Sequence, residues 1–321
     1  MAGIGVFGHI GYNVEGTYDT YVPASYFLEA LSESMALKID RFEIKNIFGK
    51  GAEPDDMTGL RHVEGDIVFA AAPKPLGYFL NAVLGAETVV TTTASLGVVK
   101  FRQSGSDYDT SRPLPSLSVE INRDVTSAFL ISGCIVNKLT LSNQPNQDLR
   151  VTANLIGKTL AIGAQTVTTS VTFPSTPTFP FAFDQSSISI YGAASAIFES
   201  FECVIDNQLD PVAVLNNSNK ISRVYRKGPP TVRLTATMEF NNLTEFGNFQ
   251  SQSEFAVSAV WTRASSFSLV LNFPRCVFNE YPVNIGGRER ILVKASMIAR
   301  YDSSSGTIEA RLGGLQTTYL A

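Results

Sequence analysis

The sequence predicts a mainly β protein made of two tandem domains, each a β-sandwich or open barrel with one flanking α-helix. The first observation is an internal repeat: residues 133–137 (Gly-Cys-Ile-Val-Asn) match residues 275–279 (Arg-Cys-Val-Phe-Asn). The second is a series of short segments in which apolar and polar residues alternate between turn-forming residues, as in β-strands. The third is the length, since 321 residues can form two domains of about 150 residues each.

The repeat continues downstream without a gap and also extends upstream. The further matching blocks are residues 149–156 with 291–298, 116–122 with 266–272, and 33–40 with 199–206. Four similar blocks in the same order predict a duplicated unit of about 130–150 residues, which is an ordinary domain size. Two copies place two similar binding surfaces on one chain.

Residues 1–30 are rich in glycine and aromatic residues and show no steady period. They predict an extended N-terminal arm that ends in a short helical turn over residues 24–31. Domain 1 is expected over residues 31–163, with a long turn-forming stretch at residues 45–61. The strands expected in domain 1 are residues 34–42, 63–70, 95–103, 116–123, 129–142 and 149–158.

One helix is expected in domain 1. Apolar residues recur from Leu76 to Leu84 at the spacing of a helical face. Pro75 lies near the start of this segment and Gly85 lies just past its end, which is the usual asymmetry of a helix.

The second domain repeats this order after a linker. Residues 164–180 are rich in Thr, Pro and Ser and poor in charge, so they are the expected linker, and domain 2 is expected over residues 181–321. The elements expected there are strands at residues 197–206, 232–240, 255–263, 267–273, 276–284, 289–301 and 307–312, and a helix around residues 243–251.

Charge and apolar content limit the kinds of partner. The net charge is −4 and no basic run is longer than Arg226-Lys227, whereas nucleic-acid binding needs clustered Lys and Arg. No stretch reaches the roughly 18 apolar residues of a membrane-spanning helix, and residues 1–5 lack the features of a signal peptide. Charged residues are only 17% of the chain, below the usual fraction of about a quarter, which is typical either of a surface covered by partner subunits or of a β-rich protein.

The three cysteines form an odd set without close spacing. Cys134 and Cys276 occupy equivalent positions of the repeat, within apolar strand patterns. They are therefore expected to be buried thiols, and the chain is expected to be made in a reducing cytoplasm.

The residue types of enzyme active sites are sparse. With His9 and His62 as the two histidines, metal sites built on His or paired Cys are excluded, and no cofactor is expected. Residues 3–8 match the GxGxxG pattern, but no strand precedes it and no helical period follows, so a flexible arm is the better interpretation. No nucleophile elbow occurs, and the sequence around Asp55 and Asp56 is not a calcium-binding loop. The chain is not expected to be an enzyme, although paired carboxylates brought together by the fold leave no local signature.

The features that do indicate a function concern assembly. Both copies insert a long polar excursion between their first two strands, at residues 44–61 and 207–220, and long loops in compact domains are usually functional or disordered. The simplest shared role is contact with a neighbouring subunit, and unrelated surface loops are the alternative. The aromatic arm is expected to dock as well. The residues expected at such an assembly interface are Tyr12, Tyr18, Tyr21, Phe48, Pro54, Asp55, Asp56, Asn216, Asn217 and Lys220.

Several blocks together resemble one known family. They are residues 11–17 (Gly-Tyr-Asn-Val-Glu-Gly-Thr) up to Pro23, Phe27-Leu28, residues 32–34, Gly65-Asp66-Ile67 before the helix, and residues 133–139 (Gly-Cys-Ile-Val-Asn-Lys-Leu). This pattern and its order are similar to those of the major tail tube proteins of long-tailed (siphovirus-type) bacteriophages, here in a duplicated-domain form. The resemblance covers most of the chain.

The resemblance implies a β-sandwich with a flanking helix that closes into rings by joining sheets into one inner β-barrel. The rings stack into a tube for genome passage, so the expected location is the virion tail, after synthesis in the host cytoplasm. The implied partners are further copies of the chain, the tape-measure protein and DNA in the lumen without specific binding, and the tail terminator and initiator proteins. Rings of six domains imply a trimer with pseudo-sixfold symmetry, with a hexamer as the alternative. Candidate lumen-facing acids are Glu120, Asp148, Glu239 and Glu289.

Two other functions stay open at this point. One is a different duplicated β-structural virion or injection-system component, such as a tube initiator or an accessory protein. The other is a two-domain β-sandwich binding module, which predicts an exposed aromatic platform. The single tryptophan, Trp261, lies within a strand pattern and argues mildly against that platform.

Overall fold

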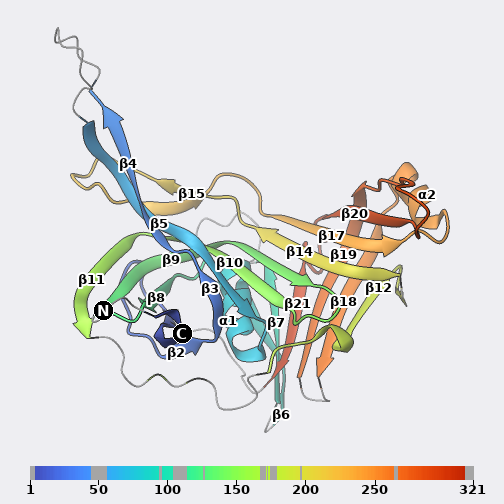
Figure 1. Ribbon diagram of the computed structural model, residues 1–321, viewed down its shortest axis with the longest axis horizontal. Coiled ribbons are helices and arrows are strands. Elements are labelled where there is room, and N and C mark those ends of the chain that lie inside the picture. The colour runs from blue at the N-terminus through green and yellow to red at the C-terminus, as the bar shows by residue number, and fades with distance from the viewer. Residues whose placement is uncertain are drawn as a thin grey trace.

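The computed structural model describes residues 4–44, 56–93, 96–103, 114–125, 127–166, 171, 173, 179–195, 197–263 and 267–314. Most of these residues lie in β-strands, which confirms the mainly β fold class (Figure 1). Within these ranges, no helix has the length and apolar character needed to cross a membrane.

The elements follow the order of the repeat. Domain 1 contains the helix α1 (Pro73–Leu84). The strands of domain 1 are β1 (His9–Val14), β2 (Tyr26–Leu28), β3 (Ala30–Glu33), β4 (Ala36–Glu43), β5 (Asp56–Ala70), β6 (Gly85–Thr93), β7 (Leu96–Gln103), β8 (Leu117–Asn122), β9 (Ser127–Asn143), β10 (Arg150–Gly157) and β11 (Thr159–Thr166). Domain 2 contains the helix α2 (Thr244–Ser251). The strands of domain 2 are β12 (Ser186–Ile190), β13 (Ala193–Ala194), β14 (Phe198–Asp206), β15 (Leu209–Val212), β16 (Arg223–Arg226), β17 (Thr231–Glu239), β18 (Phe255–Arg263), β19 (Phe267–Glu280), β20 (Leu292–Ala299) and β21 (Glu309–Gly314). Short 3-10 helices occupy Gly5–Phe7 and Phe183–Gln185.

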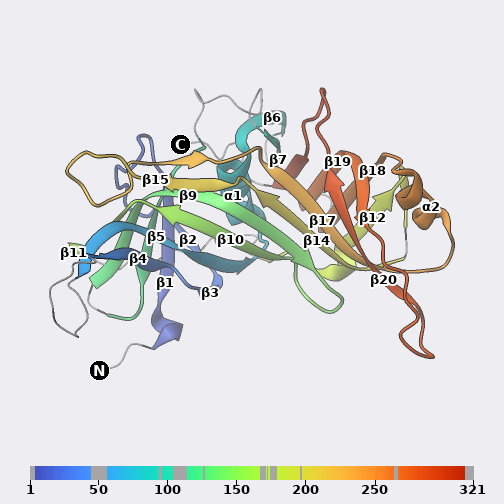
Figure 2. The same cartoon turned by 90° about the horizontal axis from the view of Figure 1, so that it is seen from above.

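One antiparallel sheet runs through both domains, and we call it the shared sheet. Its strands follow the spatial order β4, β5, β10, β9, β14, β17, β20, β19, with β3 continuing the β4 edge along β5 (Figures 1 and 2). Each domain adds a second sheet, and each pair of sheets encloses a core of alternating apolar residues. In domain 1 the second sheet has the order β2, β1, β8, β9, β11, and in domain 2 it has the order β13, β12, β18, β19, β21.

The long strands β9 and β19 are shared by the two sheets of their domains. Each pairs with the second sheet through its first half and with the shared sheet through its second half. Gly133 lies between the two halves of β9 with a φ of 67°, a conformation that glycine adopts without strain. The repeat aligns Arg275, next to Pro274, with this position, and the two strands expected at residues 267–273 and 276–284 form the single strand β19.

Strand pairing corrects two of the sequence matches. Residues 116–122 matched residues 266–272, yet β8 pairs with β1 and β9 as β18 pairs with β12 and β19, so β18 is the true counterpart of β8. The match of residues 33–40 with 199–206 is displaced by two residues, because the strand registers align Ala36 with Val204. The first error arises because successive strands carry the same alternation, and the second because a shift of two residues keeps every side chain on the same face of a strand.

Helix α1 agrees with its sequence signal. Pro73 and Pro75 lie in its first turn, and Gly85 ends it in the left-handed conformation, with a φ of 80°. The predicted apolar face, from Leu76 to Leu84, is completely buried. Because the helix is covered on all sides, its position in the domain is determined by packing.

The expected N-terminal arm is part of domain 1. Residues 9–14 form β1, which pairs with β8, and the helical turn expected at residues 24–31 is instead β2 and the start of β3. Gly11 interrupts the alternation of apolar and polar residues that would indicate a strand. A Cβ at this position would lie 2.6 Å from the Cβ of Ala24, so the close approach of the two segments requires glycine. Tyr12, at 2% exposure, packs in the core against Tyr78 and Phe79.

The linker expected at residues 164–180 is only partly described. Strand β11 continues to Thr166, beyond the expected end of domain 1. Residues 167–170, 172 and 174–178 lie outside the described residues. Phe181 is buried and donates its backbone N–H to the carbonyl of Ala71, so the chain entering domain 2 is anchored on domain 1.

Cys134 and Cys276 are buried free thiols, as expected, and Cys203 is a third buried free thiol. Burial raises the pKa of Cys276 to about 12 and raises the pKa of Cys134 and of Cys203 well above the ordinary range. Because the thiolate is the reactive form, we expect the native protein to react with Ellman's reagent at none of them and the unfolded protein to react at all three. Rapid reaction of the native protein would contradict this packing.

Candidate functional site

The two domains of one chain are joined by strand pairing, and this joint is the most informative surface of the molecule. Strand β14 of domain 2 pairs with β9 of domain 1, from Phe201 opposite Asn143 to Asp206 opposite Lys138. The Lys138 ammonium lies 3.4 Å from the Asp206 carboxylate across the two strands. We call this pairing the domain joint. It makes the two domains one continuous sheet instead of two units on a flexible linker.

Two asparagines close the end of the domain joint. The backbone N–H of Asn207 donates to the carbonyl of Asn137 at 2.8 Å, and the Asn137 Oδ1 accepts the N–H of Leu209 at 2.9 Å. The side chain of Asn207 is buried and donates to the carbonyls of Val83, at 2.9 Å, and Val136, at 3.2 Å. These bonds satisfy buried backbone groups of both domains, so the register of the joint is tightly specified.

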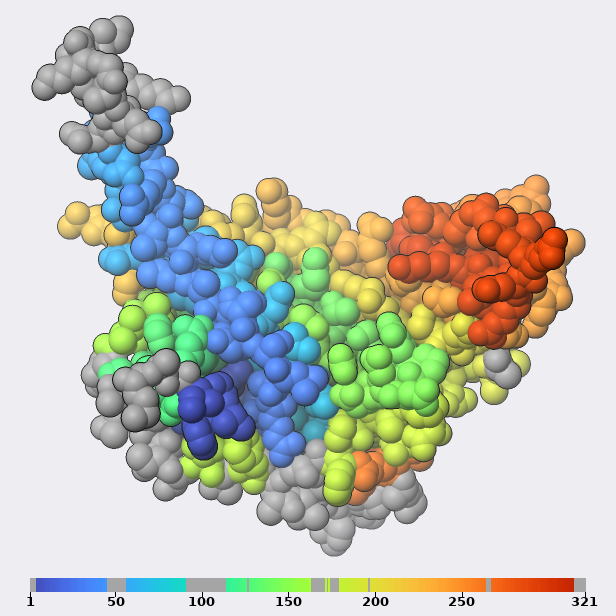
Figure 3. Space-filling view, viewed as in Figure 1, coloured from blue at the N-terminus to red at the C-terminus, as the bar shows by residue number. Residues whose placement is uncertain are grey.

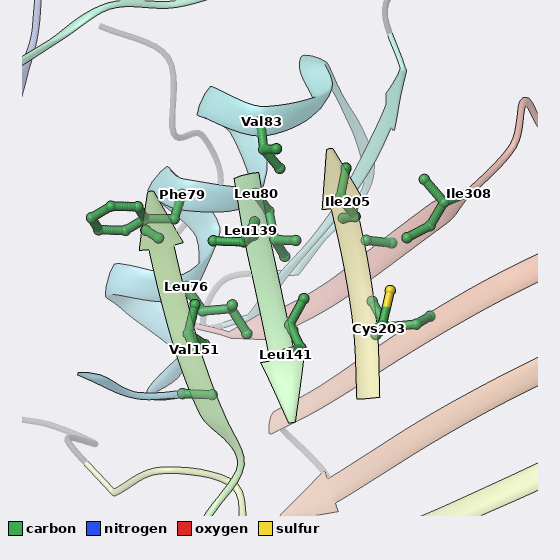
Figure 4. Packing of buried hydrophobic residues seen from close by; sticks show 14 of the residues in the cluster. Leu76, Phe79, Leu80, Val83, Leu139, Leu141, Val151, Cys203, Ile205 and Ile308 are labelled. Atoms are coloured by element: carbon green, nitrogen blue, oxygen red, sulfur yellow. The ribbon is translucent and has the colours of Figure 1, made fainter. Parts of the chain in front are cut away.

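Helix α1 covers the domain joint from the core side. Figure 4 shows Leu80 and Val83 of α1 beside Leu139 of β9 and Ile205 of β14. Ile205 is completely buried although it belongs to the other domain. The helix of domain 1 therefore packs on strands of both domains, and the joint has a hydrophobic layer as well as a backbone ladder.

Two further segments cross between the domains. The β6–β7 hairpin follows α1 in the sequence, yet β7 pairs with β21 and extends the second sheet of domain 2. The hairpin of β15 and β16 lies in the polar excursion of domain 2 and reaches back over domain 1. There the N–H of Arg61 donates to the carbonyl of Asn219 at 2.7 Å, and the Lys220 ammonium lies 3.3 Å from the Thr159 hydroxyl.

The shared sheet ends in two open edges. One is β4, where Leu37 and Ile39 are 40% and 46% exposed although they point to the same face as buried Met35. The other is the second half of β19, where Asn279 and Glu280 are exposed. Within the described residues, neither β4 nor the part of β19 beyond Cys276 pairs with a further strand on its outer side. Unpaired edges of this kind are templates for pairing with another chain.

The expected assembly residues are distributed over several surfaces. Asn216 and Asn217 are exposed at the tip of the β15–β16 hairpin, whereas Lys220 contacts domain 1 of its own chain. Asp56 begins β5 and forms an ion pair with Arg41 at 3.0 Å. Phe48, Pro54 and Asp55 lie outside the described residues.

The three tyrosines expected at the interface pack within their own subunit. Tyr12 belongs to the core, and Tyr18 lies over Gly133 under the Lys158 ammonium. Burial, with the nearby Glu120 carboxylate, raises the pKa of Tyr21 to about 12. The aromatic segment therefore docks on domain 1 itself, which differs from the expected contact with a partner.

The four candidate lumen acids also occupy different places. Glu120 is 3% exposed, and its carboxylate lies 3.3 Å from His9 in the second sheet of domain 1, so it cannot line a channel. Asp148 lies in the turn before β10 and faces Arg150. Glu239 ends β17 on the polar face of the shared sheet, next to Arg290, and Glu289 is exposed in the loop before β20.

The open edges themselves were missed from the sequence. Lys38, Asn279 and Glu280 carry no motif, and edge strands show the same alternation as internal strands. A signal was nevertheless present, because the repeat aligns Asn279 with Asn137, which closes the domain joint. A polar residue kept at a matching strand position in both copies could have indicated a matching contact.

Comparison with known proteins places this architecture in a family. A search of curated proteins found no match to the chain. The model of a family described as phage tail tube protein matches residues 8–299, which includes both domains and both open edges. That description indicates a structural role in a virion tail and not an enzymatic one. The chain therefore belongs to the phage tail tube protein family.

Proposed function

We propose that this chain is the self-assembling subunit of a phage tail tube and that three copies close into each ring. The observation that carries the proposal is the domain joint. Strand β4 is the counterpart of β14, and the second half of β19 is the counterpart of β9. Each chain thus presents, at its two ends, the two halves of the contact that already joins its own domains.

A contact between unlike edges repeats head to tail. Such contacts form a closed ring when the rotations between successive units add up to one full turn. The domain joint relates domain 1 to domain 2 by one rotation, and the contact between chains would relate domain 2 to domain 1 of the next chain by a similar rotation. With six domains per ring, as in the family resemblance, three chains complete the circle. Closure also covers both open edges of the shared sheet, which protects that sheet from uncontrolled aggregation.

The polar face of the shared sheet is the surface that best fits the lumen. The opposite face is covered by the helices and the second sheets. The polar face carries both charge signs among Ser and Thr residues, for example Lys138, Glu202 and Arg233. A mixed surface does not hold DNA, because tight binding needs clustered basic residues. The tape-measure protein and the genome would pass it without specific binding, and terminator and initiator proteins would cap the tube.

Stacking of rings would use the surfaces that project from the sheet. The β4–β5 hairpin extends far beyond the body of the molecule (Figure 3). The exposed apolar side chains Phe42 and Met57 lie on it. We assign this hairpin to contact with the adjacent ring.

Electron microscopy of the purified protein over a concentration series tests the proposal. We expect hollow tubes whose end views show threefold symmetry with six similar domains. Rings of six chains would overturn the threefold closure. Ribbons that do not close would overturn ring formation, and a single ring that never polymerises would instead indicate an initiator.

A further inference from the structure

We infer that the contact between chains is specified by an ion pair between Lys38 on β4 of one copy and Glu280 on β19 of the next. This inference rests on the proposed ring. It extends the domain joint, where Lys138 on β9 faces Asp206 on β14. The charges are exchanged: the β9-type strand carries the lysine within a chain and the glutamate between chains.

The position of Glu280 follows from the register of its strand. In domain 1, β9 pairs Val136 with Leu155 and then, after an irregularity, Lys138 with Asn154. In domain 2, β19 pairs Phe278 with Met297 and then, after the same irregularity, Glu280 with Ser296. The two strands match through this irregularity, so Glu280 stands in the place of Lys138.

The position of Lys38 follows in the same way. Along β5, Leu37 lies opposite Val63 and Lys38 lies opposite His62. Along the equivalent strand β17, Ile205 lies opposite Val232 and Asp206 lies opposite Thr231. Because Val63 and Val232 are equivalent positions relative to β10 and β20, Lys38 stands in the place of Asp206. Transfer of the joint register then pairs Leu37 with Tyr281, Lys38 with Glu280 and Ile39 with Asn279.

Backbone groups at the β4 edge are oriented for this pairing. The N–H of Ser34 donates inward to the carbonyl of Asp66. The groups of Met35 point outward, where its N–H donates to Glu33 and its carbonyl accepts from Arg123. Strand alternation therefore directs the N–H and carbonyl groups of Leu37 and Ile39 outward as well. Arg123 covers the β4 edge at Met35, so the part of this edge that another chain could pair with begins after Met35.

The β19 edge matches from its side. The carbonyl of Asn137 accepts across the domain joint, and Asn279 is its counterpart. Three positions further along, Pro282 lacks an N–H, but in this register that group would face β20, whose pairing with β19 has already ended at Glu280. The proline therefore removes no bond from the contact between chains. Such edge positions are where sheets tolerate proline.

Side-chain burial supports the same contact. Leu37 takes the place of Ile205, which is completely buried at the domain joint, and yet it is 40% exposed in the single subunit. Tyr281 takes the place of Leu139 and is already buried in the single subunit, so the β19 side of the contact is packed before another chain binds. Within the described residues, neither Lys38 nor Glu280 has an ion-pair partner in its own subunit.

The exchange of charges has a consequence for pairing. Domain 1 against another domain 1 would place Lys138 opposite Lys38, and domain 2 against another domain 2 would place Glu280 opposite Asp206. Like charges directly opposite each other on paired strands are destabilising. Because the domain joint already pairs β9 with β14 inside each chain, these like-charge contacts would oppose only a domain-swapped arrangement in which the joint opens.

Charge reversal tests the inference in the full-length chain. We expect Lys38→Glu and Glu280→Lys each to raise the critical concentration for assembly about tenfold, because every contact in the ring then opposes like charges. The double variant Lys38→Glu/Glu280→Lys should return it to near the wild-type value. Lys227→Glu, at an exposed position on neither edge, changes the net charge as Lys38→Glu does and should assemble normally. Light scattering gives the critical concentration, and circular dichroism verifies the fold of each variant.

The outcomes separate this inference from the proposed function. Single variants that assemble like the wild type, or a double variant no better than the single ones, would overturn the ion pair while the tubes themselves still form. Failure of the wild-type chain to form rings would overturn the proposed function instead.

A mixture of the two single variants adds a test of ring number. Strict alternation of Lys38→Glu and Glu280→Lys chains matches charges at every contact, but only in rings with an even number of chains. In a ring of three, at least one contact keeps like charges, so we expect incomplete rescue. Full rescue would support the ion pair and overturn closure by three chains, and no rescue at all would overturn the ion pair.

Discussion

Replacement of Ile39 by proline is expected to impair ring formation strongly while the subunit stays folded. The N–H of Ile39 points away from β5 and is the donor that would meet the carbonyl of Asn279 in the next chain. Proline removes that donor and places its ring against the incoming strand, whereas edge strands tolerate proline when the missing N–H faces outward. The preceding residue, Lys38, is already extended, as proline requires.

The expected size of this effect follows from the number of contacts. Every contact in a closed ring loses a hydrogen bond and gains a steric conflict, so we expect the critical concentration to rise by at least about tenfold. Sedimentation of assembled protein measures the change, and thermal unfolding of the unassembled subunit verifies the fold. Ile39→Val keeps both the N–H and the β-branched side chain and should assemble normally. Tubes of the proline variant at wild-type concentration would contradict the edge contact.

Replacement of Glu15 by alanine is expected to lower the free energy of unfolding by about 3–5 kcal/mol. The Glu15 carboxylate is buried and accepts four hydrogen bonds, from the hydroxyls of Ser116 (2.7 Å) and Ser118 (2.8 Å) and from the N–H groups of Gly133 (2.9 Å) and Asp19 (3.0 Å). It thereby ties the N-terminal segment to β8 and to the bend of β9. Alanine would leave buried donors without an acceptor, and this desolvation cost is the main part of the loss.

Denaturant unfolding of the unassembled subunit measures this loss. Glu15→Gln keeps the side-chain shape and one acceptor oxygen, so its destabilisation should be smaller than that of Glu15→Ala. Glu29→Ala removes an exposed carboxylate from the same segment and should change stability by no more than about 0.5 kcal/mol. Equal stability of Glu15→Ala and the wild type would show that the segment is not held by this carboxylate.

Local patterns were enough to predict most elements of the two domains. The strands around Val63, Leu141 and Val151, and the helix that ends at Gly85, follow from alternation, helical spacing and a left-handed glycine. These elements are predictable because each pattern depends only on residues that lie close together in the sequence. The segment of residues 9–28 was misread because Gly11 and its aromatic neighbours interrupt the period, although close packing requires that glycine.

The candidate site was less predictable. The lumen acids were predicted from their charge and from the alternating faces of the later strands, and Glu120 is buried between His9 and Tyr21. The excursion predicted at residues 44–61 overlaps β5, which begins at Asp56, and the one predicted at residues 207–220 contains strand β15. The sequence also could not show that the β15–β16 hairpin lies back on its own chain, near Arg61. Exposure and contact depend on distant segments, and composition carries little information about them.

The sequence by itself determined the β class, the duplication, the two helices and the family resemblance, because all of these are recorded in local periodicity and in the order of similar blocks. Only the tertiary structure decided which strands meet across the two domains and which stay open. Strands β9 and β14 are separated by more than 50 residues at their contact, and β19 shows the same alternation as its paired counterpart β9. A strand's pattern reports the face it buries, whereas its pairing depends on backbone hydrogen bonds that every residue type except proline can make. For that reason Lys38 and Glu280 became recognisable as edge residues only in the folded chain.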